Sequence, residues 1–305
     1  MSVRCAYLSK LKKANYNGET INNANLSEYT TFHTGGKCCC LLKIATLENF
    51  IHVMINLNSH HIPYFILGGG SNLLVSDSGY KGVVVKLIGD FARIEMQGEI
   101  MECGAGVTLS QAYVFARNMG LSGLEESAGI PATIGGATYM NAQAYNFEMS
   151  KIVDYVIVYL NGKIRYFSNL DCSYSYRRSI FMDNHAIILR VGLKLQSLDK
   201  NTIQQKYMDT IAKRQQSQPL DLGSAGCVFK KYDGYETSRM LDQMGVKSMS
   251  VGGAMVSMKH ANFIVNYDNA SSTDIYRLIK KIKQKFYETY GIELQLEIKL
   301  LGEFE

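Results

Sequence analysis

The sequence predicts an α+β protein built from more than one domain. Apolar runs of strand length alternate irregularly with segments in which apolar residues recur at helical spacing. Several of the runs stop at glycine-rich loops, most clearly at 68–72 and 129–137. With 305 residues the chain is long enough for two or three domains, and its 27 glycines against 3 prolines favour glycine turns over rigid linkers.

In the first part of the chain the pattern is strand, helix, strand and further strands. Apolar runs predict strands over 41–44, 64–67, 73–75 and 83–87, and helical periodicity predicts a helix over 47–58. The glycine loop 68–72 therefore joins one strand to the next.

Beyond residue 101, short strands and helices follow one another. Strands are predicted over 153–160 and 187–195, and helices over 109–118, 202–215, 237–244 and 273–290. The last helix is the best marked, because Ser271 and Ser272 can cap its start and Gly291 can end it. The tail 292–300 alternates strictly between apolar and polar residues, which predicts a terminal strand with Glu297 on its polar face.

Composition and charge exclude several classes of protein. The net charge of +5 is scattered along the chain, which fits an anionic small molecule better than nucleic acid. No apolar run approaches the ~18 residues of a membrane helix, and the N-terminus lacks a signal-peptide core, so we expect a cytoplasmic protein. Seven cysteines without a CxxC pair, three of them adjacent at positions 38–40, predict neither a disulfide framework nor a metal site.

The first glycine loop is a candidate phosphate site. Its residues are Gly68, Gly69, Gly70, Ser71 and Asn72. Glycines at the end of a strand allow successive backbone N–H groups to turn inward and approach a phosphate closely. No crossover helix follows, so the loop is neither a GxGxxG fingerprint nor a Walker loop. A plain glycine turn is an equal alternative.

The second glycine loop has the small residues that let a flat ring lie against backbone. It contains Gly129, Ile130, Pro131, Gly135 and Gly136. A tightly packed core loop is an equal alternative for this segment alone. Two such loops in one chain favour an extended ligand with a pyrophosphate and a flat ring, and FAD suits that description.

Three ionisable residues are candidates for chemistry. Arg177 belongs to an adjacent arginine pair that could equally be a solvated surface pair. Cys227 follows Gly226 in a turn that would expose its sulfur, although a single cysteine is usually buried filler. Glu297 lies on the polar face of the predicted terminal strand, where exposed glutamates are common. From these residues alone, the sequence indicates an enzyme with a nucleotide cofactor.

Ten short motifs follow one another along nearly the whole chain. They lie at 31–36, 66–74, 123–125, 129–131, 135–137, 140–142, 176–177, 225–230, 259–263 and 294–302. In this combination the chain resembles the UDP-N-acetylenolpyruvoylglucosamine reductase family. The short path from 195 to 218 resembles the form of the family that lacks an extra tyrosine-bearing loop.

The resemblance implies a fold and a domain division. It implies a two-lobed FAD-binding domain of the vanillyl-alcohol-oxidase (p-cresol methylhydroxylase) type, with a smaller α+β substrate-binding domain. The lobes are expected at 1–88 and 89–203 and the substrate-binding domain at 204–291. The terminal strand, 292–305, is expected to return near the active site.

The resemblance also implies an activity in peptidoglycan precursor synthesis. NADPH reduces FAD and leaves, and hydride then passes to the vinyl carbon of UDP-N-acetylglucosamine enolpyruvate. Arg177 matches the arginine that stabilises the enolate, Glu297 matches the glutamate that assists it, and the position of Cys227 is that of the proton donor. Tyr176 and Lys230 are expected near the substrate or the nicotinamide phosphates. We expect a monomer without a metal, a nucleic-acid partner or a membrane partner.

Four positions depart from the family pattern. The proton donor is usually serine, whereas Cys227 offers a thiol, whose ordinary pKa of about 8.5 makes it a better acid but open to oxidation or alkylation. Lys231 and Tyr232 stand where Asn-Pro is common, so an asparagine that would orient the donor is missing. Gln143 replaces a common glycine, which we interpret as a tolerated loop change.

Two other functions are compatible with these departures. One is a different FAD oxidoreductase of the same fold, such as an oxidase of hydroxy acids or sugars. The other is a flavin-binding paralogue that keeps the fold without turnover. The presence of both Arg177 and Glu297 favours the reductase over either alternative.

Overall fold

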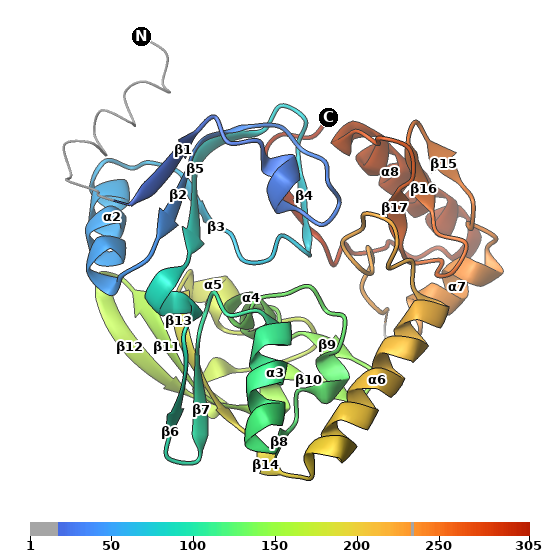
Figure 1. Cartoon of the computed structure of the whole chain (residues 1–305). Helices are drawn as coiled ribbons and strands as arrows, with labels where there is room; N and C mark the ends of the chain where they lie inside the picture. Colours follow the sequence, from blue (N-terminus) through green and yellow to red (C-terminus); the bar gives the residue numbers. More distant parts are fainter. Residues whose placement is uncertain (1–17, 233–234) are drawn as a thin grey trace. The chain divides into compact units, whose positions relative to one another are not determined.

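The computed structural model describes residues 18–232 and 235–305, which divide into two compact units (Figure 1). Unit 1 contains the described residues of 18–22, 40–69 and 82–212, and unit 2 contains those of 23–39, 70–81 and 213–305. The N-terminal segment, for which the sequence predicts no signal peptide, lies outside the described residues. The domain boundaries expected at 1–88, 89–203 and 204–291 stay a prediction.

The first sheet of unit 1 is covered by a helix. Its strand order is β1-β2-β5-β3, formed by Glu19–Asn22, Cys38–Ile44, Tyr80–Leu87 and Tyr64–Ile66. Strand β1 is antiparallel to β2, and β3 is parallel to β5. Helix α2 (Leu47–Ser59) begins after Thr46, whose side chain accepts a hydrogen bond from the Asn49 N–H, and it buries Phe50 and Met54 in the core.

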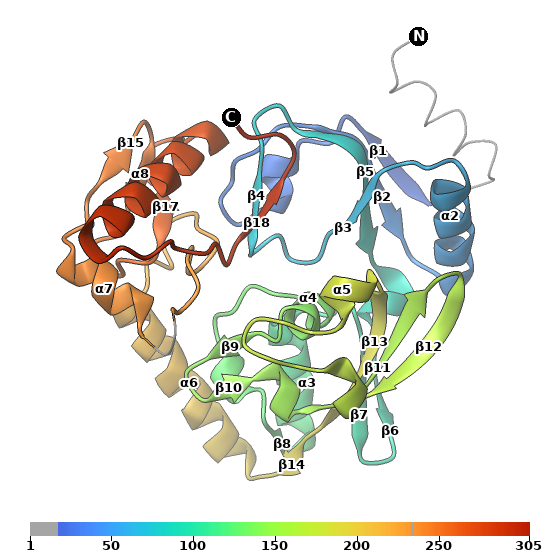
Figure 2. The ribbon, with the colours of Figure 1, turned by 180° about the vertical axis from the view of Figure 1, so that it is seen from behind.

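The second sheet of unit 1 is five-stranded and antiparallel (Figure 2). Its order is β12-β11-β13-β7-β6, formed by Lys163–Ser168, Val153–Leu160, Ile187–Lys194, Ile100–Gly104 and Ile94–Gln97. Helix α3 (Leu109–Met119) starts with a capping box between Thr108 and Gln111 and ends at Gly120 in the left-handed conformation. The shorter elements are α4 (Ile134–Tyr139), α5 (Phe181–Asn184), β8 (Leu121–Ser122), β9 (Gln143–Ala144), β10 (Phe147–Glu148) and β14 (Gln196–Ser197).

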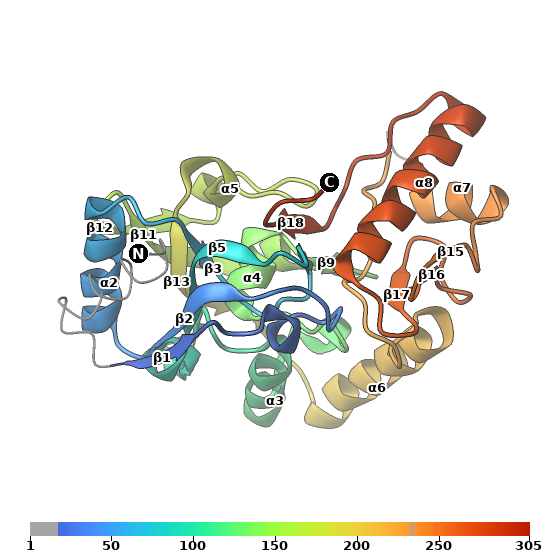
Figure 3. The ribbon, with the colours of Figure 1, turned by 90° about the horizontal axis from the view of Figure 1, so that it is seen from above.

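Unit 2 combines a small sheet with a long helix (Figure 3). Strands β15 (Ser250–Val251), β16 (Ala254–Val256) and β17 (Ile264–Asn266) are antiparallel, and α8 (Ser272–Tyr290) packs on β15 and β16. Strand β4 (Leu73–Val75) pairs in parallel with β18 (Lys299–Leu301). The remaining helices are α7 (Thr237–Gln243) and α6 (Lys200–Ser217), whose residues run from unit 1 into unit 2. The last helix, predicted over 273–290, is α8, and its apolar residues at helical spacing are buried, which confirms that prediction; they are Ile275, Leu278, Ile279, Ile282 and Phe286.

Five short 3₁₀ helices complete the described chain. They are η1 (Leu26–Tyr29), η2 (Gly89–Ala92), η3 (Glu125–Ser127), η4 (Met149–Lys151) and η5 (Leu170–Cys172). No helix in the described ranges is long and apolar enough to cross a membrane.

The terminal strand predicted over 292–300 is wrong for most of its length. Only Lys299–Leu301 is a strand, and Glu297, expected on a solvated face, is 8% exposed. The physical reason is that two other segments, those of Val228 and Asn72, lie against the backbone around Glu297. The N–H of Glu297 donates to Val228 at 2.8 Å, and its carbonyl accepts from Asn72 at 3.1 Å. The alternation of apolar and polar residues therefore predicted that Leu294 and Ile298 are buried. It did not predict that other segments also bury Glu297 on the polar side.

Asp77 holds the start of α8. Its carboxylate accepts hydrogen bonds from the N–H groups of Ser272 and Thr273, each at 2.8 Å, and from the Thr273 hydroxyl at 2.6 Å. Partial burial raises the pKa of Asp77, but these hydrogen bonds outweigh that effect and lower it below its usual value. A negative charge at this end also complements the helix dipole.

We expect Asp77→Asn to destabilise the protein in a pH-dependent way. At pH 7 the loss should be about 1 kcal/mol, as for other helix N-terminal acceptors. Because the folded pKa is below the unfolded one, the contribution is present above pH ~4 and is lost as pH falls through the folded pKa. Denaturation midpoints measured from neutral to acidic pH should converge for the two proteins. A constant difference down to pH ~2 would contradict this, and Asp268→Asn, an exposed site in the same unit, is the control.

Candidate active site

The loop 68–72 offers a run of backbone donors. In the described part of the chain, the N–H groups of Gly68, Gly69, Gly70 and Ser71 donate no hydrogen bond, whereas the carbonyls of Gly68 and Gly70 each accept one. Gly70 has a φ of 65°, which glycine adopts without strain. Successive unused N–H groups are what an anion requires. The loop therefore has the donors that the predicted pyrophosphate role needs.

The two glycine-rich loops lie against each other where both belong to unit 1. A Cβ on Gly68 would lie 2.8 Å from Thr133 Oγ1. A Cβ on Gly69 would lie 2.5 Å from the carbonyl oxygen of Pro131. In the second loop, most N–H groups already donate hydrogen bonds to other groups of the chain. They are those of Ile130, Ala132, Ile134, Gly135 and Gly136. It can thus offer a surface of small residues, but few phosphate donors.

Lys86 supports the first loop from strand β5. Its Nζ donates to the carbonyl of Gly68 at 3.0 Å. Burial lowers the pKa of Lys86, and nearby Lys43 lowers it further. Our sequence analysis missed this residue, although a lysine inside the apolar run 83–87 is a signal that could have indicated it.

Tyr176 and Arg177 form the corner of a tight turn in unit 1. Ser175 and Arg178 exchange both backbone hydrogen bonds, at 3.0 and 3.1 Å, and Arg177 has a left-handed φ of 55°. The Arg177 guanidinium lies 5.7 Å from the centre of the Tyr176 ring, and its Nη1 donates to the carbonyl of Gln143 at 3.1 Å. These contacts give the predicted enolate-stabilising cation a defined position.

A network centred on one carboxylate supports this turn. Asn141 Nδ2 donates to the Ser175 carbonyl and to Glu148 Oε1, each at 3.0 Å. The same Glu148 oxygen accepts from Gln143 Nε2 and Ser150 Oγ, each at 2.9 Å. Burial raises the pKa of Glu148, but these hydrogen bonds outweigh it and the pKa lies below its usual value. The hydrogen bond from Arg177 uses the backbone carbonyl of Gln143, which any residue supplies, whereas the Gln143 side chain adds a donor to Glu148 that the glycine common at this position lacks.

Cys227 lies on an extended segment between two other segments of unit 2. On one side its backbone pairs with Phe263 in an antiparallel bridge. On the other side the N–H of Glu297 donates to the carbonyl of Val228 at 2.8 Å. Two of the predicted catalytic residues, Cys227 and Glu297, are thus brought onto adjacent segments of one unit.

Asn72 connects the first glycine loop to the segment of Glu297 within unit 2. Its Nδ2 donates to the Glu297 carbonyl at 3.1 Å, and its own carbonyl accepts from the Lys299 N–H at 2.9 Å. The sequence predicted Asn72 as a cofactor residue. The structure shows a further contact, which fixes the backbone at Glu297.

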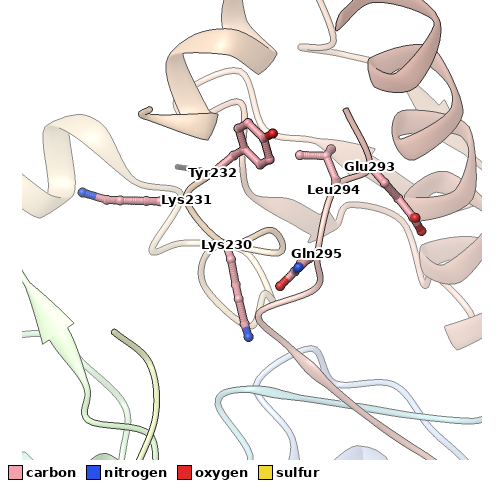
Figure 4. A pocket seen from close by; sticks show the side chains of 6 residues that line it. All are labelled: Lys230, Lys231, Tyr232, Glu293, Leu294 and Gln295. Atoms are coloured by element: carbon pink, nitrogen blue, oxygen red, sulfur yellow. The ribbon is translucent and has the colours of Figure 1, made fainter. Parts of the chain in front are cut away.

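Lys230 lines a cavity of about 260 Å³ in unit 2 (Figure 4). The other lining residues are Lys231, Tyr232, Glu293, Leu294 and Gln295. The Lys230 N–H donates to the Gln295 carbonyl at 2.9 Å, and the side chains of the two lysines point in different directions (Figure 4). Lys231 forms an ion pair with Glu236 at 2.5 Å. In the described chain Lys230 has no ion pair, so its charge suits the anionic ligand predicted for it.

Two family models match the chain. A model described as FAD binding domain matches residues 40–166. A model described as UDP-N-acetylenolpyruvoylglucosamine reductase, C-terminal domain, matches residues 218–301. Together with the mixed α and β elements and the donor-rich glycine loop, these matches define an FAD-binding protein.

Relatives match over nearly the whole chain. The UDP-N-acetylenolpyruvoylglucosamine reductase of Caldanaerobacter subterraneus is 37% identical over 297 residues, covering 97% of this chain and 98% of the relative. That of Clostridium novyi is 36% identical, covering 93% of each. A solved structure from Thermus caldophilus matches with a TM-score of 0.81 and 34% identity, covering 94% of this chain and 99% of that one. The chain therefore belongs to the UDP-N-acetylenolpyruvoylglucosamine reductase family and is an FAD-dependent oxidoreductase, which confirms the predicted family and fold class.

We expect Gly69→Ala to weaken FAD binding. The added Cβ would have to displace the carbonyl of Pro131, and overpacking of about 1–3 kcal/mol corresponds to a loss of roughly tenfold or more in affinity. Visible absorbance per protein and titration of the apoprotein with FAD measure this. Gly98→Ala is the control, because a Cβ on Gly98 would meet no atom within 4 Å; Gly98, unlike Gly69, has a positive φ, so any backbone strain falls on the control. Equal FAD affinity in Gly69→Ala and the native protein would contradict the packing argument.

Proposed function

We propose that this chain reduces UDP-N-acetylglucosamine enolpyruvate to UDP-N-acetylmuramate in peptidoglycan precursor synthesis. The overall reaction consumes one NADPH and one proton and adds two hydrogens across the vinyl bond. The observation that carries the proposal is the placement of a thiol residue, Cys227, beside the segment of Glu297 in a chain of this family. Protonation of an enolate requires an acid within reach of the carbon, and the Cys227 thiol can supply that proton.

The residues of the two glycine loops fit FAD. We assign the pyrophosphate to the N–H groups from Gly68 to Ser71, and the flat ring to the small-residue surface of 129–136. Bound FAD supplies hydride transfer from NADPH to the terminal vinyl carbon. The residues of the chain bind and orient the reactants, stabilise the developing negative charge and donate the proton.

Arg177 is assigned to the substrate carboxylate. As hydride arrives at the vinyl carbon, negative charge spreads over the adjacent carbon and the carboxylate. A fixed guanidinium lowers the energy of that charge most where it develops. The hydrogen bond to Gln143 and the contact with Tyr176 support this role, because they hold the cation before the charge forms.

Cys227 is assigned as the proton donor, and Glu297 as the residue that assists stabilisation of the enolate. The thiol gives its proton to the carbon that carries the carboxylate, and the resulting thiolate is reprotonated from water. The backbone contact between Glu297 and Val228 supports the pairing of these roles. Lys230, next to the cavity of Figure 4, is assigned to the diphosphate of the substrate, and Tyr176 to the same ligand.

We further propose that the enzyme works in the cytoplasm as a monomer, without a nucleic-acid or membrane partner. The net charge of +5 is scattered along the chain, which supports the absence of a nucleic-acid partner. Size-exclusion chromatography with light scattering tests the oligomeric state.

The activity is tested with the purified protein and its visible spectrum. The proposal predicts a yellow protein whose NADPH consumption depends on added UDP-N-acetylglucosamine enolpyruvate. A yellow protein that oxidises NADPH at the same rate without that substrate would favour another flavin oxidoreductase. A yellow protein that shows neither reaction would favour a flavin-binding paralogue.

Replacement of Cys227 tests the proton donor. We expect Cys227→Ala to lower turnover by about 10²- to 10⁴-fold, the usual contribution of a general acid, while NADPH still bleaches the flavin. Cys227→Ser should keep part of the activity, because a hydroxyl can donate a proton from the same position. Turnover of Cys227→Ala at the native rate would remove Cys227 from the mechanism.

A further inference from the structure

Asn262 bonds to both backbone groups of a residue close to Cys227. The Phe229 N–H donates to Asn262 Oδ1 at 2.9 Å, and Asn262 Nδ2 donates to the Phe229 carbonyl at 2.8 Å. Asn262 is 5% exposed, and both hydrogen bonds are buried. The side-chain amide therefore acts as a strand partner for Phe229.

The backbone of Asn262 continues the same pairing. Its carbonyl accepts from the Val228 N–H at 2.9 Å, and the next residue, Phe263, forms the bridge to Cys227. The carbonyl of Val228 accepts the N–H of Glu297. The segment 227–229 is thus held on one side by Asn262 and Phe263 and on the other by the segment of Glu297.

Asn262 is itself oriented by a histidine. Its N–H donates to His260 Nδ1 at 3.2 Å, and the His260 ring lies 4.7 Å from the ring of Phe263. An accepting Nδ1 carries no proton, and burial lowers the pKa of His260, with Lys247 adding to that effect. The neutral imidazole therefore fixes the direction of the Asn262 backbone.

We propose that Asn262 is a positioning residue for the proton-transfer step. The inference rests on the proposed function of Cys227 and Glu297. Asn262 affects the reaction only indirectly, because it bonds the backbone of the segment 227–229. By fixing that backbone it sets the direction in which the Cys227 side chain projects. A shift of about 1 Å in a reacting group can cost on the order of 100-fold in rate.

A merely structural role predicts a different pattern of defects. Reduction of the flavin by NADPH does not use the proton donor, whereas reoxidation by the enolpyruvyl substrate does. Loss of positioning should therefore slow the second half-reaction alone. General loss of structure should lower FAD content, flavin reduction and reoxidation together.

The experiment compares Asn262→Ala with Asn266→Ala in the FAD-bound full-length protein. Asn266 is a matched control, because its side chain also bonds two backbone groups, Phe32 O at 2.9 Å and Ala270 N at 2.7 Å, and neither of these bonds involves 227–229. For Asn262→Ala we expect flavin reduction within about twofold of native and reoxidation slower by about 10- to 100-fold, mainly in kcat. The solvent isotope effect on reoxidation should rise, because proton transfer becomes slower than hydride transfer. Asn266→Ala should leave both half-reactions within about twofold of native.

Native reoxidation in Asn262→Ala would overturn the proposal, as would equal slowing of both half-reactions or an equal defect in Asn266→Ala. If Asn262→Ala does not yield FAD-bound protein, the rates of flavin reduction and reoxidation are compared in Asn262→Asp instead. This variant keeps the acceptor for the Phe229 N–H and loses the donor to the Phe229 carbonyl. Failure of the proposed function is distinguishable. In that case the native protein would ignore the substrate, or Cys227→Ala would be active.

Discussion

The peptide groups of Val228 and Phe229 are hydrogen-bonded on both sides, and the proposed chemistry of unit 2 depends on this arrangement. Asn262 satisfies the N–H of each residue and the carbonyl of Phe229, while Glu297 satisfies the carbonyl of Val228. Leaving one such buried group unpaired costs about 1–3 kcal/mol, so the segments move little relative to one another. Cys227 and Glu297 owe their defined positions to backbone pairing outside any regular strand.

In unit 1, small residues and one carboxylate hold the proposed functional groups in defined positions. Gly69 packs so tightly against Pro131 that a Cβ would collide with its carbonyl oxygen, and in the described chain the N–H groups of Gly68 and Gly69 donate no hydrogen bond. Glu148 gathers the donors that steady the turn of Arg177. In both units, reactive groups lie on irregular backbone that neighbouring segments hold in place.

Local periodicity was sufficient to predict most of the fold and the residues of the main motifs. The helix expected at 47–58 is Leu47–Ser59, and the strand expected at 153–160 is Val153–Leu160, because each buries one regular face. The strand expected at 292–300 failed, since alternation says nothing of the segments that cover Glu297. The pairings of Asn262 with Phe229 and of Gln143 with Arg177 join residues about 33 positions apart. Such pairings follow from tertiary packing, and no local pattern in one sequence reveals them.

Amide hydrogen exchange of the FAD-bound protein tests the central claim, that the segment 227–229 is locked between its two neighbours. The amides of Val228, Phe229 and Glu297 all donate hydrogen bonds across this ladder. They should exchange as slowly as the amides in the middle of α8, although the residues belong to no helix or strand. Exchange as fast as in an exposed loop would show that the segment opens freely, and would contradict an account in which backbone pairing positions Cys227 and Glu297.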